Sequence, residues 1–135
     1  MPSRPFYYRV TEGIRITVRP VFVPEQSDPA RRRYVFAYFV RLENTGDVAA
    51  QLLTRRWLIH DDIGEETEVA GDGVVGQQPM LAAGDVHEYN SFCVLKAPSG
   101  WMEGHYHFAR AGGAGFDALI PRFQLSTTID AGPVH

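Results

Sequence analysis

Three glycines in the middle of this 135-residue chain have the spacing of a phosphate-binding motif. The G-x-G-x-x-G dinucleotide fingerprint is matched by Gly71, Gly73 and Gly76. That fingerprint holds a pyrophosphate at a helix N-terminus, directly after a parallel strand. Here Pro79 follows within three residues and no helical period comes after it, so a Rossmann-type site is excluded.

Two interpretations of the glycine segment remain open. Backbone N–H groups of a glycine-rich loop can bind an anion without any helix, and Arg55 or Arg56 would add positive charge for a pyrophosphate or a (di)nucleotide. In the other interpretation, the glycines form a tight loop between strands because they accept positive φ angles. Asp72, inside the segment, opposes the binding of an anion.

The two arginines precede Trp57 on a predicted strand. Alternate residues of a strand share a face, so a core-facing Trp57 would place Arg55 on the inner face and Arg56 on the outer one. A core-facing arginine needs a carboxylate or carbonyl partner, because an unpaired buried charge is costly. Alternatively, the stem of Arg55 packs over the tryptophan ring.

Two histidines alternate on another predicted strand, His105 and His107, and their imidazoles would share one face. Some metal sites use this spacing. A third ligand would have to come from His60, His87 or a carboxylate, and the sequence places none of these beside the pair. Divalent-metal binding is therefore a weak alternative to a pair of solvent-facing histidines.

The sequence contains no arrangement of residues typical of catalysis. It has no G-x-S-x-G, no Walker lysine and no HExxH motif. The single cysteine, Cys93, lies on the predicted inner face of a strand, where a free thiol behaves as a small hydrophobic side chain. We therefore expect neither catalytic residues nor a cofactor, and a protein that is not an enzyme.

Short runs in which apolar and polar residues alternate, separated by turn residues, predict the β-strands that position these groups. Their regular spacing is typical of an all-β protein, and we expect an immunoglobulin- or fibronectin type III-like β-sandwich of about seven or eight antiparallel strands. The domain is expected at 11–125, between an N-terminal arm at 1–10 and a C-terminal tail at 126–135. Pro20 interrupts the first long run and the apolar phase changes after it, which predicts an edge strand with a bulge or a switch of sheet there.

Composition excludes several classes of protein. Hydrophobic residues make up 44% of the chain and charged residues 21%, so intrinsic disorder is excluded. One cysteine cannot form an internal disulfide or a thiolate zinc site. No run approaches the roughly 18 apolar residues of a membrane span, and the N-terminus has no apolar signal region. We therefore expect a cytoplasmic protein with no membrane contact.

The net charge of −3 conceals an uneven distribution. Residues 1–60 carry ten arginines and five acidic residues, whereas residues 61–135 carry three basic and eleven acidic residues. The acidic second half and the isoelectric point near 5.9 oppose a broad phosphate-binding surface, so no nucleic-acid partner is expected.

Several segments taken in order resemble the ApaG family: 52–57 (LLTRRW), 71–79 (GDGVVGQQP), 89–91 (YNS), 98–106 (PSGWMEGHY), Phe116 and 120–125 (IPRFQL). The resemblance implies a fibronectin-type sandwich without established enzymatic activity. It implies a link, by name and phenotype, to cobalt and magnesium resistance and to a neighbouring dinucleoside-tetraphosphate hydrolase. Related eukaryotic domains look like interaction modules, and a pyrophosphate role is suggested for the glycine motif.

We accordingly expect a protein-interaction module with an unidentified protein partner or a second copy of the chain. A pyrophosphate-containing small molecule at the glycine segment is the first alternative, and a divalent metal is the second. An interaction module should have a contiguous exposed apolar or aromatic patch, or an edge strand open to pairing.

Overall fold

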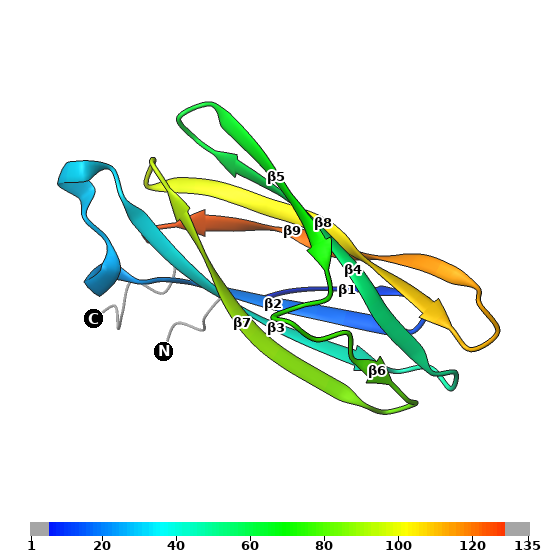
Figure 1. The fold of residues 1–135 in the computed structure, drawn as a ribbon. Helices are drawn as coiled ribbons and strands as arrows, with labels where there is room; N and C mark the ends of the chain where they lie inside the picture. The colour runs from blue at the N-terminus through cyan, green and yellow to red at the C-terminus, as the bar shows by residue number, and fades with distance from the viewer. Residues whose placement is uncertain (1–5, 129–135) are drawn as a thin grey trace.

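Two antiparallel β-sheets pack face to face in the computed structural model, which describes residues 6–128 (Figure 1). Sheet 1 has the strand order β1 (Tyr7–Thr11), β2 (Ile14–Phe22), β3 (Tyr34–Asn44), β7 (Val86–Leu95). Sheet 2 has the order β5 (Glu65–Asp72), β4 (Ala50–Asp61), β8 (Ser99–Arg110), β9 (Gly115–Ser126), and the short β6 (Met80–Leu81) also pairs with β4. No helix in the described residues is long and apolar enough to cross a membrane.

The expected all-β sandwich is confirmed, with nine strands in the described residues. One of the additional strands is β1, which begins within the segment expected as an N-terminal arm, and another is the two-residue β6. β1 forms a hairpin with β2 through Glu12 and Gly13, which both have positive φ angles as tight hairpin turns require.

The core lies between the sheets, and alternate residues of β3 point into it. Phe36, Val40 and Leu42 on its inner face are almost fully buried. Its outer face also carries buried residues, because Val35 and Ala37 form a small second cluster with Val23, at the start of the connection to β3. β3 is therefore apolar on both faces, as expected of a central strand, and it lies between β2 and β7.

The expectation of an edge strand with a change of phase at Pro20 is wrong. β2 lies between β1 and β3, and its register with β3 is unbroken from Ile14 to Phe22. The even-numbered residues face the core along the whole strand. β1 pairs with β2 only as far as Val18. Among residues 6–128, β2 has one strand neighbour beyond that point, and a proline is tolerated there because fewer ladder hydrogen bonds are required.

A β-bulge in β4 positions the predicted site residues. The register between β4 and β8 shifts between Leu52 and Thr54. Leu52 faces the core before the bulge, and Trp57 faces it afterwards, so the inward phase changes from even to odd positions. This extra residue turns Arg55 toward the space between the sheets.

Candidate functional site

The glycine segment forms a tight hairpin after β5 rather than an open anion-binding nest. The backbone N–H of Val74 donates to the Gln77 carbonyl at 2.8 Å, and the Gln77 N–H donates back at 3.0 Å. Between them, Val75 and Gly76 have φ angles of +48° and +77°, as in a type I′ turn. Gly73, at φ +62°, donates its own N–H to the Leu53 carbonyl. The Gly73 and Val74 N–H groups are therefore already used within the protein.

Arg55 anchors this hairpin from β4. Its Nη1 donates to the carbonyls of Asp72 at 2.8 Å and Gly73 at 2.9 Å. A Cβ at Gly71 would lie 3.0 Å from both terminal nitrogens of the guanidinium, so the missing side chain leaves room for Arg55 over β5. The carbonyl partner that a core-facing arginine requires is thus present, and carbonyl oxygens rather than N–H groups face Arg55.

Arg56 does not join this site. It lies on the outer face of sheet 2, where its Nη2 forms an ion pair with Glu68 on β5. Both side chains are more than half exposed, so the pair contributes little to stability. The structure therefore brings Arg55, Gly71 and Gly73 together and separates Arg56 from them.

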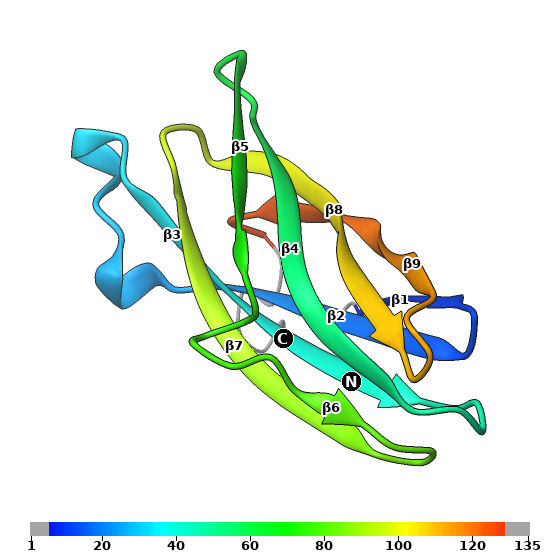
Figure 2. The ribbon, with the colours of Figure 1, turned by 45° about the vertical axis from the view of Figure 1, so that its right-hand side comes forward.

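Arg55 also lines a cavity of about 420 Å³ between the two sheets. The hairpin after β5 passes beside β7 (Figure 2), and its Val74 and Val75 line the cavity together with residues of β7. Trp57 and Met102 are buried residues of the apolar wall, and Ser91 and Asn90 come from β7. The other lining residues are Tyr38, Ile59, Val69, Val74, Val75, Tyr89 and Phe92.

Three tyrosines, Tyr38, Tyr89 and Tyr106, lie near the guanidinium of Arg55. The hydroxyls of Tyr89 and Tyr106 form a hydrogen bond across the sheets. Burial raises the pKa of Tyr38, Tyr89 and Tyr106 above its ordinary value, and the charge of Arg55 opposes that shift only weakly. These phenols therefore keep their protons at neutral pH. The β-strand alternation placed Tyr89 on an inner face, but pairing it with Tyr106 and Arg55 required the tertiary structure.

The two candidate metal ligands lie on the outer face of sheet 2. His105 and His107 share that face as expected, and His107 Nδ1 lies 2.9 Å from the Asp117 carboxylate. In residues 6–128, no group of three or more histidine, cysteine or acidic side chains could hold a metal ion. Metal binding by this pair stays a prediction.

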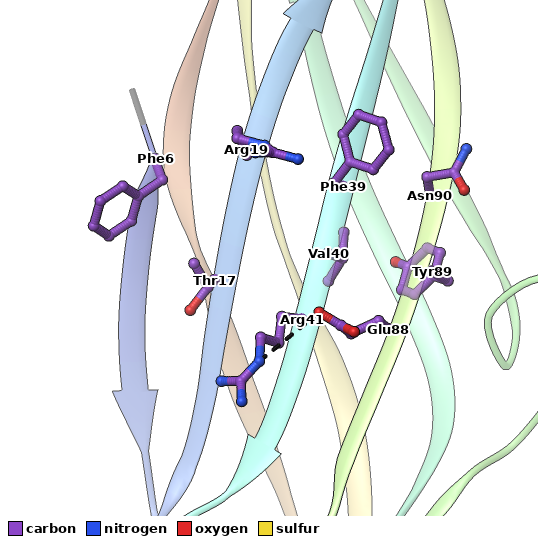
Figure 3. A pocket seen from close by; sticks show the side chains of 9 residues that line it. All are labelled: Phe6, Thr17, Arg19, Phe39, Val40, Arg41, Glu88, Tyr89 and Asn90. Carbon is purple, nitrogen blue, oxygen red and sulfur yellow. Dashed lines mark ion pairs between the residues drawn. The ribbon is translucent and has the colours of Figure 1, made fainter. Parts of the chain in front are cut away.

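The outer face of sheet 1 carries an exposed aromatic and basic surface. It includes a shallow cavity of about 590 Å³, in which Phe6, just before β1, Arg19 on β2 and Phe39 on β3 follow one another across the sheet (Figure 3). The guanidinium of Arg19 lies 5.1 Å from the centre of the Phe39 ring. Arg41 forms an ion pair with Glu88 at the lower end of this cavity.

Comparison with known proteins identifies the fold and the lineage together. A family model described as ApaG domain matches residues 24–110. Protein ApaG of Anaeromyxobacter sp. (strain K) is 57% identical over 116 residues, which cover 86% of this chain and 91% of that protein. Protein ApaG of Rhizobium meliloti (strain 1021) is 46% identical over 121 residues, which cover 90% and 93%.

The structural comparison agrees with these relatives. The crystal structure of a protein named ApaA from Bordetella pertussis superposes with a TM-score of 0.82 at 45% identity, and the match covers 93% of this chain and 97% of that one. The curated relatives carry only the name Protein ApaG, which indicates no enzymatic activity. With the family model matching 24–110 and these relatives matching most of the chain, the protein belongs to the ApaG family.

Proposed function

We propose that this ApaG-family protein is a non-enzymatic binding module that contacts a protein partner through the outer face of sheet 1. The observation that carries this proposal is a contiguous exposed surface of aromatic and basic side chains. We call it the sheet-1 face, and it consists of Tyr8, Arg15, Arg19, Phe39, Phe92 and Val94.

The strand register makes this surface continuous. Arg19 on β2 pairs with Phe39 on β3, and Ala37 on β3 pairs with Phe92 on β7. Phe39 is 40% exposed and Phe92 52% exposed, which is a large apolar area to leave in water. Aromatic residues and arginine dominate the energetically important positions of protein interfaces. The composition of the sheet-1 face therefore supports a protein ligand.

Charge indicates the chemistry of the partner. Arg15 and Arg19 stack on Tyr8 and Phe39, and neither has a carboxylate at ion-pair distance within residues 6–128. A partner surface that combines carboxylates with apolar side chains would complement these two arginines and the exposed aromatic rings beside them.

The test compares substitutions on the two outer faces. Arg19→Glu and Phe39→Ser change the sheet-1 face, and Arg122→Glu is the matched control, because Arg122 lies over Trp101 on the outer face of sheet 2. A protein captured by the immobilised wild type is purified, and its affinity is measured for each variant. We expect each sheet-1 substitution to weaken binding at least tenfold and the control to leave it unchanged.

Three results would contradict the proposal. The captured protein could bind the sheet-1 variants as tightly as the wild type, it could lose affinity equally with Arg122→Glu, or no protein could bind saturably. Sedimentation adds a further result: a dimer abolished by Arg19→Glu would assign the face to a second copy of this chain. On this proposal the protein acts in the cytoplasm, and its link to cobalt and magnesium resistance runs through the partner.

A further inference from the structure

An arginine without a carboxylate partner lies in the cavity between the sheets. Within residues 6–128, Arg55 has no acidic side chain at ion-pair distance, and its Nη1 carries both of its hydrogen bonds. No protein acceptor in that part of the chain contacts its Nε–Nη2 edge. Arg15 Nε is the one buried side-chain nitrogen or oxygen in those residues that lacks a partner. The unpartnered Nε and Nη2 of Arg55 are therefore not buried, and this edge borders accessible space.

We propose that this cavity binds a small organic monocarboxylate, with its carboxylate on Arg55 and its apolar body between the sheets. The Nε–Nη2 edge of a guanidinium presents two parallel N–H groups that match a planar carboxylate. The cavity volume of about 420 Å³ lies within the range of small-molecule sites. This ligand would not depend on the N–H groups of the glycine hairpin, and the site is distinct from the sheet-1 face.

The walls select for a ligand with an apolar body. Trp57 is 3% exposed and Met102 is fully buried, and Ile59 and Val69 complete an apolar side. Tyr38 and Tyr89 line the opposite side with hydroxyl groups. Their phenols are neutral at pH 7, and burial raises their pKa further, so they can donate hydrogen bonds and do not repel an anion.

The charges select for a single negative charge. Arg55 is the sole cationic side chain among the cavity-lining residues. A pyrophosphate would bring several negative charges to this one guanidinium, and the cavity-lining residues offer no second cation to balance them. A monocarboxylate is neutralised by Arg55 alone, and its apolar body replaces water on the Trp57 side.

Val75 gives an independent indication that the cavity mouth is used. It has a φ angle of +48°, which is unfavourable for a β-branched residue, although a hairpin turn normally has asparagine or aspartate there. Its side chain is 67% exposed and lines the cavity. Unfavourable backbone conformations of this kind concentrate at functional sites.

The experiment titrates phenylacetate into the full chain and follows the Trp57 indole and Arg55 Nε–H signals by NMR. The neutral analogue 2-phenylacetamide has the same shape, and inorganic pyrophosphate tests the multiply charged alternative. Arg55→Gln removes the cation, and Val69→Trp fills the cavity from an exposed position of β5. Arg56→Gln is the matched control, because it removes a neighbouring positive charge from the other face of sheet 2.

We expect saturable millimolar binding of phenylacetate that weakens about ten- to hundredfold in Arg55→Gln, as the loss of a charge-assisted hydrogen-bond pair predicts. Val69→Trp, which leaves the anchor of the hairpin in place, should also lose binding, and Arg56→Gln should keep it. The proposal is overturned if phenylacetate causes no saturable shifts in the folded protein. Equal binding of 2-phenylacetamide, tighter binding of pyrophosphate or unchanged binding in Val69→Trp would overturn it as well.

Discussion

Alanine substitutions at two glycines of the hairpin after β5 should have very different effects on stability. Gly73 and Gly76 both have positive φ angles, +62° and +77°. A Cβ at Gly73 would lie 2.2 Å from the Gln77 carbonyl oxygen, whereas a Cβ at Gly76 would meet nothing within 4 Å. Both substitutions therefore place alanine in an unfavourable positive φ angle, but only Gly73→Ala also creates a steric clash.

The magnitudes follow from these two terms. A left-handed conformation costs an L-residue about 1 kcal/mol relative to glycine, so Gly76→Ala should lower the free energy of unfolding by about 1 kcal/mol. At Gly73 the Gln77 carbonyl must also move, which disrupts the two hydrogen bonds that join Val74 and Gln77. Each such bond contributes about 1 kcal/mol, so Gly73→Ala should cost about 3 kcal/mol.

Urea unfolding followed by tryptophan fluorescence measures both values. Gly112→Ala is a control outside the hairpin, because Gly112 has a φ angle of +93° and open space around it. It should behave like Gly76→Ala. Equal losses at Gly73 and Gly76 would refute the steric reasoning, and would indicate that the hairpin relaxes freely around an added side chain.

Three further predictions concern other parts of the structure. Asp61→Ala should lower the free energy of unfolding by about 2–4 kcal/mol. The reason is that this buried carboxylate accepts hydrogen bonds from the backbone N–H groups of Lys96 at 2.7 Å and Ala97 at 3.1 Å. A loss below about 1 kcal/mol in urea unfolding would contradict this. Val75→Asn should raise the free energy of unfolding by about 1 kcal/mol, and with it the melting temperature, because asparagine adopts a positive φ angle more readily than valine does. An unchanged melting temperature would argue against backbone strain at this residue. Burial raises the pKa of Cys93 from 9.0 to about 12. Between these two values the folded chain holds a proton that the unfolded chain releases, so the contribution of Cys93 to stability should be constant below pH 9 and fall by about 1.4 kcal/mol per pH unit from there toward pH 12. The difference between the wild type and a Cys93→Ala variant in urea unfolding at alkaline pH isolates this contribution from that of the buried tyrosines.

Much of the fold could be predicted from alternation along single strands. Cys93 is buried on β7, as the alternation of its strand predicts, and His105 and His107 share one face of β8, as their spacing predicts. The strand β1 was missed because its residues are mostly exposed and carry little periodic signal. The Glu12-Gly13 dipeptide between β1 and β2 is the local feature that could have indicated the hairpin.

The candidate site was predicted only in part. The spacing of Arg55 and Trp57 placed both on one face, and the expected carbonyl partners of Arg55 are present. Arg56 was a candidate only because it is close to the glycine segment in sequence, and it lies on the outer face of sheet 2, as its alternation with Trp57 indicated. Tyr38 and Tyr89 were not predicted to border Arg55, since each belongs to a strand of the opposite sheet.

The positions of the charged residues in the fold also could not be predicted from the sequence. The basic first part of the chain forms β1, β2 and β3 of sheet 1, whereas the acidic β5 lies in sheet 2. The sequence alone could not place these charges, because β7 returns from the acidic half to complete sheet 1.

The sequence by itself determined the class of fold, the shared face of Arg55 and Trp57 and the presence of glycines that accept positive φ angles. These properties depend on local periodicity and on backbone conformation at single residues. Only the tertiary structure decided which residues meet. The bulge between Leu52 and Thr54 and the pairing of distant strands bring Arg55 to Tyr38 and Tyr89. A period of two assigns a residue to a face of its sheet, but the partner across the sandwich depends on strand order and register.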